Sequence, residues 1–250
     1  EILDKEQLLK LEPDLAQVFK KALWIQDTLS FEDPGILVEA YANYFKENGG
    51  TLIKSKIEEL DHTGNGYQVS LGKNDVLDVD QVVIALGPWA KDFLKKFGYG
   101  VPLVFERGYH MNFSQKENKH LNRPVYDVDG GYVLAPMSKG VRLTTGVELA
   151  NQDATPNYSQ LTSAETIARA TFPLDKPLDK KPWLGSRPTL PDCRPIIGQA
   201  PRHKGLWFTI GHQHIGFSTG PGTASILGAL ISGEPSPIDA EPFRAERFVS

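Results

Sequence analysis

Several features are scarce or missing in this chain of 250 residues, and each absence excludes a class of protein. Cys193 is the single cysteine, so an intramolecular disulfide is excluded and a reducing, cytoplasmic setting is favoured. No uninterrupted apolar run is long enough to cross a bilayer. The formal net charge is −4, and no block of basic residues occurs, which argues against nucleic acid as a partner.

The amino-terminal sequence lacks two further features. Residues 1–6, EILDKE, do not resemble a secretory signal peptide. They include no initiator Met and open in charged, helix-like sequence, which predicts that an upstream part of the protein is absent. The composition is that of an ordinary globular protein, and the length suffices for one large domain or two interleaved ones.

The most informative segment is glycine-rich and spans residues 211–222, GHQHIGFSTGPG. An apolar run, LWFTI, precedes it at 206–210, and apolar residues recur at helical spacing in 223–233. A glycine loop that joins a strand to a helix directs backbone N–H groups and the positive end of the helix dipole at one place. This favours a site for an anionic group, although a ligand-free strand-to-helix turn would show the same pattern.

The remaining patterns indicate a mixed α/β and α+β fold with two interleaved domains. Asp33 and Pro34 are suited to start a helix over about 34–47, and Gly49 and Gly50 to stop it. Strand-like runs follow at 51–71, and a buried strand at 79–85 precedes a helix at about 90–97. Alternating runs between 101 and 149 predict an antiparallel sheet. A further helix is predicted over about 159–172.

Four motifs resemble the flavin-dependent D-amino-acid oxidase superfamily, and most closely its bacterial D-amino-acid dehydrogenase branch. They are residues 82–90 (VVIALGPWA), 105–109 (FERGY), 183–198 (WLGSRPTLPDCRPIIG) and 211–216 (GHQHIG). The last two, at this separation and before a terminal helix, are the more specific. Together the motifs extend over most of the chain.

The resemblance implies a partial FAD-binding Rossmann-like domain, formed by 34–100 and 184–250, interleaved with an antiparallel-sheet substrate domain, formed by 1–33 and 101–183. The family's dinucleotide fingerprint, Gly-x-Gly-x-x-Gly, is not found in this sequence, so nothing here is expected to cradle the FAD pyrophosphate. The missing amino-terminal segment, or a partner chain that carries it, is therefore an expected partner, and this chain alone is not expected to secure FAD.

The resemblance also implies the substrate residues. Arg187 falls at the family's substrate arginine, and a guanidinium matches a carboxylate bidentately; on residue type alone, a structural ion pair would be the better account. Tyr132 matches a position whose hydroxyl assists carboxylate binding, with a half-buried sheet tyrosine as the equal alternative. Tyr109 and His110 are weaker candidates for the wall of the substrate pocket. His214 is a candidate to line either the flavin or the substrate.

The expected contacts with FAD come mainly from the loops, and the binding is expected to be noncovalent because Cys193 does not match the covalent attachment position. A plain core isoleucine would explain Ile57 almost equally well, and a neutral, hydrogen-bonded histidine is the better account of both His212 and His214. No metal site is expected. The predicted cofactor-binding residues are Ile57, Ala85, Gly87, Trp89, Gly211, His212, Gly216, Phe217, Ser218 and Thr219.

The implied reaction is oxidation of a D-amino acid to the imino acid by hydride transfer to flavin N5, with hydrolysis to the keto acid afterwards. No side chain stands out as a general base, which suits this chemistry. The electron acceptor is a quinone or oxygen, and a quinone-linked enzyme would favour peripheral contact with the inner face of the cell membrane. Two alternatives remain: an oxidase or dehydrogenase of glycine, sarcosine or a cyclic amine such as hydroxyproline, and a non-catalytic binding or assembly module.

Overall fold

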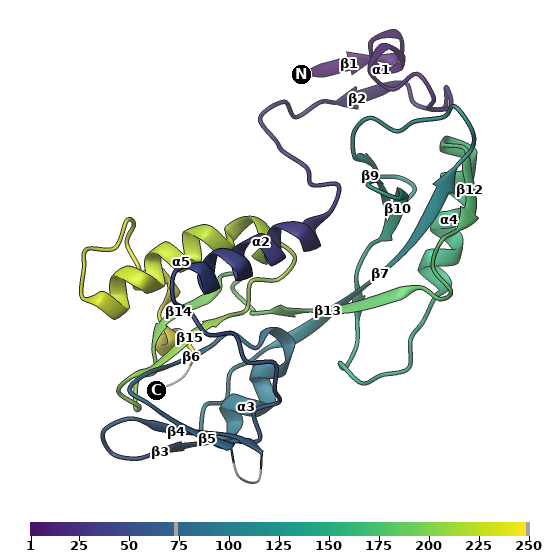
Figure 1. Ribbon diagram of the computed structural model, residues 1–250. Helices are drawn as coiled ribbons and strands as arrows, with labels where there is room; N and C mark the ends of the chain where they lie inside the picture. Colours follow the sequence, from purple (N-terminus) through teal and green to yellow (C-terminus); the bar gives the residue numbers. More distant parts are fainter. Residues whose placement is uncertain (73–74, 249–250) are drawn as a thin grey trace. The chain divides into compact units, whose positions relative to one another are not determined.

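The computed structural model describes residues 1–72 and 75–248 (Figure 1). The chain forms two compact units, each assembled from segments that are distant in sequence. Unit 1 comprises Glu1–Leu52, Gly108–Glu148 and Ala154–Gly185, and unit 2 comprises Ile53–Arg107, Leu149–Asp153 and Ser186–Ser250.

This division differs from the predicted domain boundaries over short stretches at residues 101–107, 149–153 and 184–185, and most extensively at residues 34–52. The prediction grouped residues 34–52 with the FAD-binding part, whereas the structure assigns them to unit 1. Helix α2 (Pro34–Glu47) has no buried residue. The segment just before it is bonded within unit 1, because the N–H of Ser138 donates to the carbonyl of Glu32.

Unit 1 is built on the predicted antiparallel sheet, which the structure confirms. The strands follow the order β11-β7-β10-β9-β8, and β12 and β13 also pair with β7. Their bounds are β7 Val104–Gln115, β8 Val125–Asp127, β9 Tyr132–Met137, β10 Gly140–Thr145, β11 Glu148–Leu149, β12 Leu174–Pro177 and β13 Trp183–Thr189.

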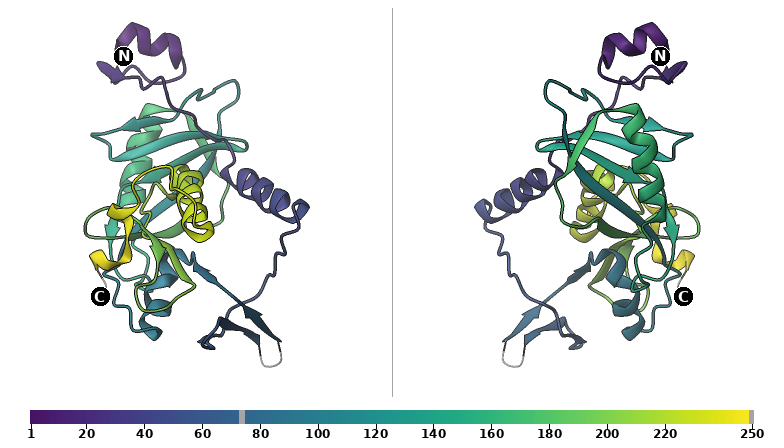
Figure 2. Two further views of the ribbon diagram at one scale, coloured as in Figure 1. Left: turned by 90° about the vertical axis from the view of Figure 1, so that its left-hand side faces the viewer. Right: turned by 90° about the vertical axis from the view of Figure 1, so that its right-hand side faces the viewer.

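One face of this sheet forms the core of unit 1. Because successive side chains of a strand point to opposite faces, Phe113, Leu134 and Leu143 lie on the same side, and all three are completely buried. Helix α4 (Ser159–Thr171) covers that side of the sheet (Figure 2). Its Leu161 and Ala164 belong to the same buried cluster. The predicted helix at 159–172 is therefore confirmed.

The first residues of unit 1 form a small motif that joins the core of the unit through Leu8 and Leu15. Strands β1 (Ile2–Asp4) and β2 (Lys21–Leu23) pair antiparallel, and helix α1 (Lys5–Leu11) lies between them in sequence. Asp4 and Gln7 cap α1 reciprocally, each side chain accepting from the other residue's backbone N–H. Asp33 caps α2 in the predicted way, since its carboxylate accepts from the N–H of Gly35.

The described residues of unit 2 form two three-stranded sheets. In the first, β15 (Leu206–Ile210) lies between β14 (Ile196–Gln199) and β6 (Val82–Ile84), antiparallel to β14 and parallel to β6. The second consists of β3 (Glu59–His62), β4 (Tyr67–Gly72) and β5 (Asp75–Val79). The strand-like run predicted at residues 51–57 does not form a strand.

Helices and one buried cluster complete unit 2. The helices are α3 (Ala90–Lys96), α5 (Gly216–Ser232) and the 3-10 turns η1 (Gly87–Trp89), η2 (Glu241–Phe243) and η3 (Ala245–Arg247). Leu94 of α3 and Phe208 of β15 are completely buried in a cluster with Leu103 and Leu190.

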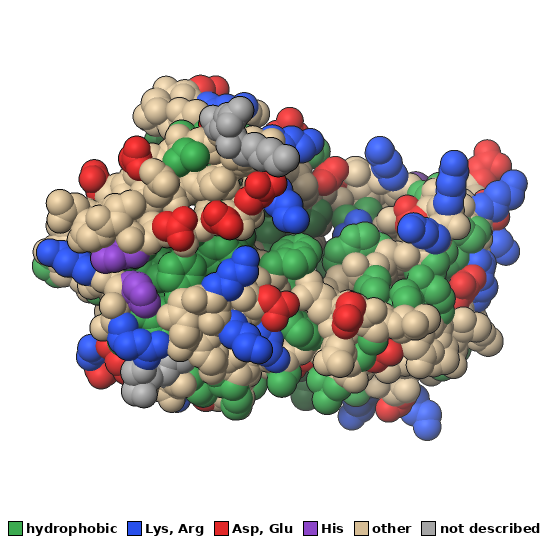
Figure 3. All heavy atoms as spheres, turned by 90° about the horizontal axis from the view of Figure 1, so that it is seen from below, with side chains coloured by type: hydrophobic (Ala, Val, Ile, Leu, Met, Phe, Trp, Pro, Cys, Tyr) green, Lys and Arg blue, Asp and Glu red, His purple; other side chains and the backbone are tan. Residues whose placement is uncertain are grey.

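On the face of the molecule in Figure 3, Lys and Arg side chains are interspersed with Asp and Glu.

Helix α5 begins earlier than the sequence pattern predicts. The apolar spacing starts at Thr223, whereas the helix starts at Gly216 and continues through Pro221. Proline has no N–H and removes one intrahelical hydrogen bond, and glycine is a poor helix former. The sequence Gly220-Pro221-Gly222 therefore predicts a loop, although this segment lies in the early turns of α5.

The position of Leu134 allows a test of the core of unit 1. Leu134→Ala removes a completely buried side chain and is expected to lower the free energy of unfolding by about 2–5 kcal/mol. Val133→Ala, on the half-buried opposite face of the same strand, should cost clearly less. Urea denaturation followed by circular dichroism measures both. Equal losses would contradict the assignment of the two faces.

Candidate functional site

The glycine loop joins β15 to α5 and spans only residues 211–215. Gly211 has a φ of +82°, and a Cβ built on it would lie 2.5 Å from Cδ1 of Leu190. Both the left-handed conformation and the close contact require glycine at this position. The loop is therefore held close to the core of unit 2.

The start of α5 presents backbone donors. Its N-cap residue, Ile215, makes no side-chain capping bond, and the amides of Gly216 and Ser218 have no acceptor within the helix. The hydroxyls of Ser218 and Thr219 instead donate to the carbonyl of Ile215, at 3.0 and 2.9 Å. The amide of Thr219 donates to the same carbonyl. The amide and the hydroxyl of Thr219 are thus both used within the helix, so the free backbone donors lie earlier in the turn, and a contact of Thr219 with FAD stays a prediction.

The two loop histidines have different surroundings. Nε2 of His212 lies 3.0 Å from Oγ1 of Thr223, and burial lowers the pKa of His212 below its ordinary value, so this ring is neutral at pH 7. A Cβ on Gly216 would lie 3.0 Å from Cβ of His212. His214 is exposed, with Nδ1 4.0 Å from Oε2 of Glu106. His212 thus supports the turn, while His214 faces outward.

The end of strand β13 is bonded directly to the glycine loop. The N–H of Gln213 donates to the carbonyl of Pro188 at 3.0 Å, and Thr189 forms an antiparallel bridge with His212. Arg187 immediately precedes these residues and is half-buried. Among the described residues, no hydrogen bond or ion pair involves its guanidinium. The alternative of a structural ion pair for Arg187 therefore finds no partner in the described part of the chain.

A second loop lies at the same edge of the sheet. Strands β6 and β15 are parallel, with Ile84 opposite Phe208, so the residues that follow them leave from the same edge. Gly87 follows β6 with a φ of +54°, and no atom lies within 4 Å of where its Cβ would be. Trp89 is 68% exposed. In open α/β sheets, ligands bind outside the carboxyl ends of the strands, which is where these two loops lie.

Ile57 is not in the strand that the sequence predicts. It lies in a segment without regular structure before β3 and is 40% exposed. A core role is therefore excluded. The proposed main-chain contact with the adenine of FAD remains a prediction.

Tyr132 and Tyr109 lie in the core of unit 1, which corrects their assignment to the substrate pocket. Each is 1% exposed. The hydroxyl of Tyr132 donates to Oγ1 of Thr171 at 2.8 Å, and burial raises the pKa of this phenol to about 12. The hydroxyl of Tyr109 donates to Oε2 of Glu148 at 2.6 Å. Strand alternation places both rings on the face that packs against α4.

The opposite face of the same sheet carries polar residues, of which the sequence analysis named His110 as a weaker candidate for the pocket wall and did not assign Asn112 or Arg142. His110 stacks on Trp183 with ring centroids 4.7 Å apart, and burial lowers the pKa of His110 to about 4. Nε of Arg142 donates to Oδ1 of Asn112. The signal was present in the alternation Val141-Arg142-Leu143, which sets a charged residue between two core residues.

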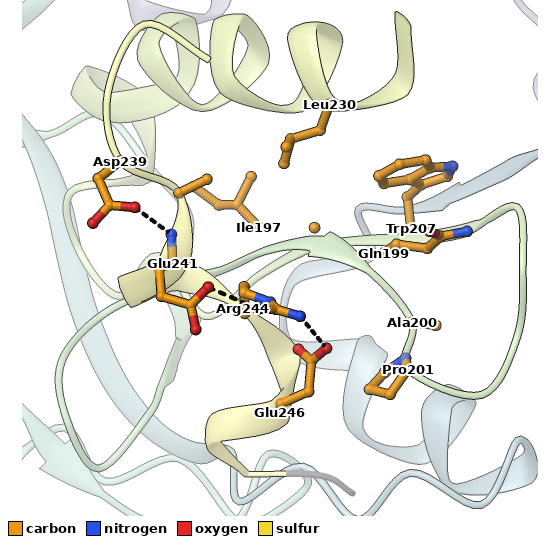
Figure 4. A pocket seen from close by; sticks show the side chains of 12 residues that line it. Ile197, Gln199, Ala200, Pro201, Trp207, Leu230, Asp239, Glu241, Arg244 and Glu246 are labelled. Atoms are coloured by element: carbon orange, nitrogen blue, oxygen red, sulfur yellow. Dashed lines mark hydrogen bonds and ion pairs between the residues drawn. The ribbon is translucent and has the colours of Figure 1, made fainter. Parts of the chain in front are cut away.

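Unit 2 also contains a cavity of about 530 Å³ between β14, Leu230 of α5 and the carboxy-terminal turns (Figure 4). Ile197, Trp207 and Leu230 form its apolar wall. Arg244 bonds to Glu241 at 2.7 Å and to Glu246 at 3.0 Å, so its charge is already neutralised. None of the predicted site residues lines this cavity.

Two further classes of site find no support in the described residues. No group of three or more His, Cys, Asp or Glu side chains there is arranged to hold a metal ion. No helix in the same part of the chain has the length and apolar character needed to cross a membrane. The one cysteine, Cys193, is exposed.

Two loops at the carboxyl edge of a parallel strand pair are the place where α/β sheets bind ligands, and the comparison with known families indicates which ligand. The chain belongs to the FAD dependent oxidoreductase (DAO) family, which matches residues 1–230. The family and its FAD cofactor are therefore those that the sequence motifs predicted.

Curated relatives support this membership over nearly the whole chain. A D-amino-acid oxidase of Bradyrhizobium diazoefficiens is 29% identical over 99% of this chain and 59% of the relative. A D-amino acid dehydrogenase of Vibrio cholerae is 30% identical over 95% and 58%. A glycine oxidase of Pseudomonas putida is 30% identical over 94% and 64%. The chain thus spans about three fifths of the length of these relatives.

Solved structures show the same fold. Glycine oxidase from Geobacillus kaustophilus superposes with a TM-score of 0.82 at 21% identity, covering 100% of this chain and 67% of that structure. L-amino acid deaminase from Proteus vulgaris also gives a TM-score of 0.82, at 22% identity, covering 99% and 63%. The mixed α/β and α+β fold predicted from the sequence is confirmed.

The core position of Tyr132 leads to a second prediction. Tyr132→Phe removes the hydrogen bond to Thr171 and is expected to lower the free energy of unfolding by about 1 kcal/mol. Thr171 keeps its own bond to the carbonyl of Ile167, so no polar group is left unpaired. Affinity for an amino-acid substrate should not change. A large increase in KM with an unchanged free energy of unfolding would contradict the core assignment and support the original prediction that Tyr132 contacts the substrate.

Proposed function

We propose that this chain forms the flavin-ring-binding and substrate-binding part of an FAD-dependent enzyme that oxidises D-amino acids to imino acids, which hydrolyse to keto acids. The observation that carries the proposal is the position of Arg187. Its guanidinium has no partner among the described residues, and its strand is bonded through Pro188 to the glycine loop. A carboxylate would satisfy this charge bidentately.

The residues present fit the ring end of FAD. Gly87 leaves open space beside its backbone, and the uncapped start of α5 supplies amide donors through Gly216 and Ser218. Preorganised donors of this kind stabilise negative charge as it develops. FAD, when bound, supplies the acceptor for the hydride from the substrate Cα. The chain's own contribution is to hold the carboxylate and to donate hydrogen bonds from the loop.

The pyrophosphate end of FAD requires a further segment, and we propose that it carries the fingerprint Gly-x-Gly-x-x-Gly. Exposed apolar residues support this proposal: Ile36, Tyr41, Tyr44 and Phe45 of α2 are between 53% and 66% exposed. Among the described strands, β6 ends its sheet, with no partner on its far side. Parallel strands are usually buried inside larger sheets, so the free edge of β6 in unit 2 suits pairing with a further strand, and the apolar face of α2 in unit 1 is a separate surface that a further segment would cover.

A second candidate function is oxidation of glycine, sarcosine or a cyclic amine, favoured by the similarity to the Pseudomonas putida glycine oxidase. The two candidates share the carboxylate and the amine and differ in the side chain. The electron acceptor, oxygen or a quinone, distinguishes oxidase from dehydrogenase. We propose a cytoplasmic setting, with peripheral membrane contact if the acceptor is a quinone.

The proposed function predicts flavin reduction by D-amino acids. The complete reading frame that contains this chain, purified with FAD, should lose its flavin absorbance when D-amino acids are added without oxygen. L-enantiomers serve as controls, and glycine and sarcosine test the second candidate. Hydrogen peroxide formed on readmission of air would identify an oxidase. A protein that binds FAD but is bleached by no amine would reject both candidates, and one that binds no FAD would favour a non-catalytic module.

The role of Arg187 predicts a specific kinetic defect. Arg187→Ala should weaken carboxylate binding by about 2–5 kcal/mol, because a paired charge is lost. Arg187→Lys should recover part of it, since lysine is a point charge without the bidentate fork. FAD content should stay unchanged in both. Arg194→Ala, at an exposed arginine of the same unit, is the matched control. An unaltered KM in Arg187→Ala would overturn the assignment.

A further inference from the structure

Gln213 adopts a backbone conformation that does not suit a glutamine. Its φ is +53°, in the left-handed region that glycine, asparagine and aspartate tolerate best. Its N–H donates to the carbonyl of Pro188, a bond that glycine would make equally well and without strain. The turn itself therefore gives no reason for a glutamine side chain at this position.

The side chain of Gln213 is also unsatisfied. Within the described part of the chain, its Nε2 atom is buried and has no hydrogen-bond acceptor. The hydroxyl of Thr189, a residue only 6% exposed, likewise has no partner there, and Thr189 bridges to His212, the residue next to Gln213. Buried polar groups are nearly always hydrogen-bonded. Two such groups at one junction indicate that a polar ligand completes it.

Backbone strain and an unpaired donor at one residue have a common explanation. Strained residues gather at ligand-binding sites, where the surrounding structure holds them in place. The N–H to Pro188 bond and the neighbouring Thr189–His212 bridge hold Gln213 in this way. The strained turn thus fixes the carboxamide in a loop at the carboxyl edge of the β6–β15 pair.

We propose that the carboxamide of Gln213 donates a hydrogen bond from Nε2 to a carbonyl oxygen of the flavin ring. The inference rests on the proposed function, because it needs FAD as the ligand of this loop. A neutral amide suits a neutral carbonyl, whereas the charged Arg187 suits the substrate carboxylate. Gln213 is thereby a cofactor-binding residue in addition to the backbone donors of the loop.

Three variants test this role in the full-length protein, with and without bound flavin. Gln213→Gly removes both the strain and the amide, so the flavin-free protein should unfold at an equal or higher temperature. The Kd for FAD should nevertheless rise about three- to tenfold, which corresponds to the loss of one hydrogen bond. Gln213→Glu keeps the length but removes the donor and should also weaken FAD. Asn118→Gly relieves a similar φ of +59° elsewhere and should leave the Kd for FAD unchanged.

Fluorescence titration gives the Kd for FAD, and infrared spectroscopy of the bound flavin gives an independent readout. Loss of the bond should move a flavin carbonyl stretching band to higher frequency in Gln213→Gly and Gln213→Glu. Unchanged affinity and an unchanged band would overturn the inference while leaving the proposed function intact. A change confined to the KM for the amino acid would also overturn it, by assigning the amide to the substrate. A wild-type protein without flavin would overturn both proposals.

Discussion

The pairing between the end of β13 and the glycine loop is the interaction on which the candidate site depends. One hydrogen bond, from the N–H of Gln213 to the carbonyl of Pro188, and one bridge, between Thr189 and His212, join them. Through this pairing, a guanidinium and the start of α5 belong to one structural element, although they are distant in sequence. Without it, Arg187 and the glycine loop would be two separate motifs with no common ligand.

Much of the fold could be predicted because local patterns were unambiguous. Asp33 and Pro34 specified the start of α2, and alternation between 101 and 149 specified an antiparallel sheet. The start of α5 could not be predicted, because Gly220, Pro221 and Gly222 disfavour a helix locally and tertiary structure overrides that preference. The family and its cofactor followed from motifs rather than from periodicity.

The candidate site was predicted less completely than the fold. Alternation along β9 shows that Tyr132 and Val133 face opposite ways, but it does not show which face packs on α4. Tyr132 was therefore assigned to the pocket while its ring lies in the core, and Arg142 on the other face was not assigned at all. Strain at Gln213 has no signature in a single sequence, because only the backbone angles reveal it.

The parallel pairing of β6 with β15 has a consequence for how the chain folds. The register joins Val82 to Leu206, so about 120 residues must be synthesised between the two strands before they can meet. Long-range pairing of this kind slows folding, since the entropy of closing a long loop is lost before contacts compensate for it. During translation, the edge of β6 that pairs with β15 stays exposed until residues 206–210 have left the ribosome, and an exposed strand edge of this kind is prone to aggregation.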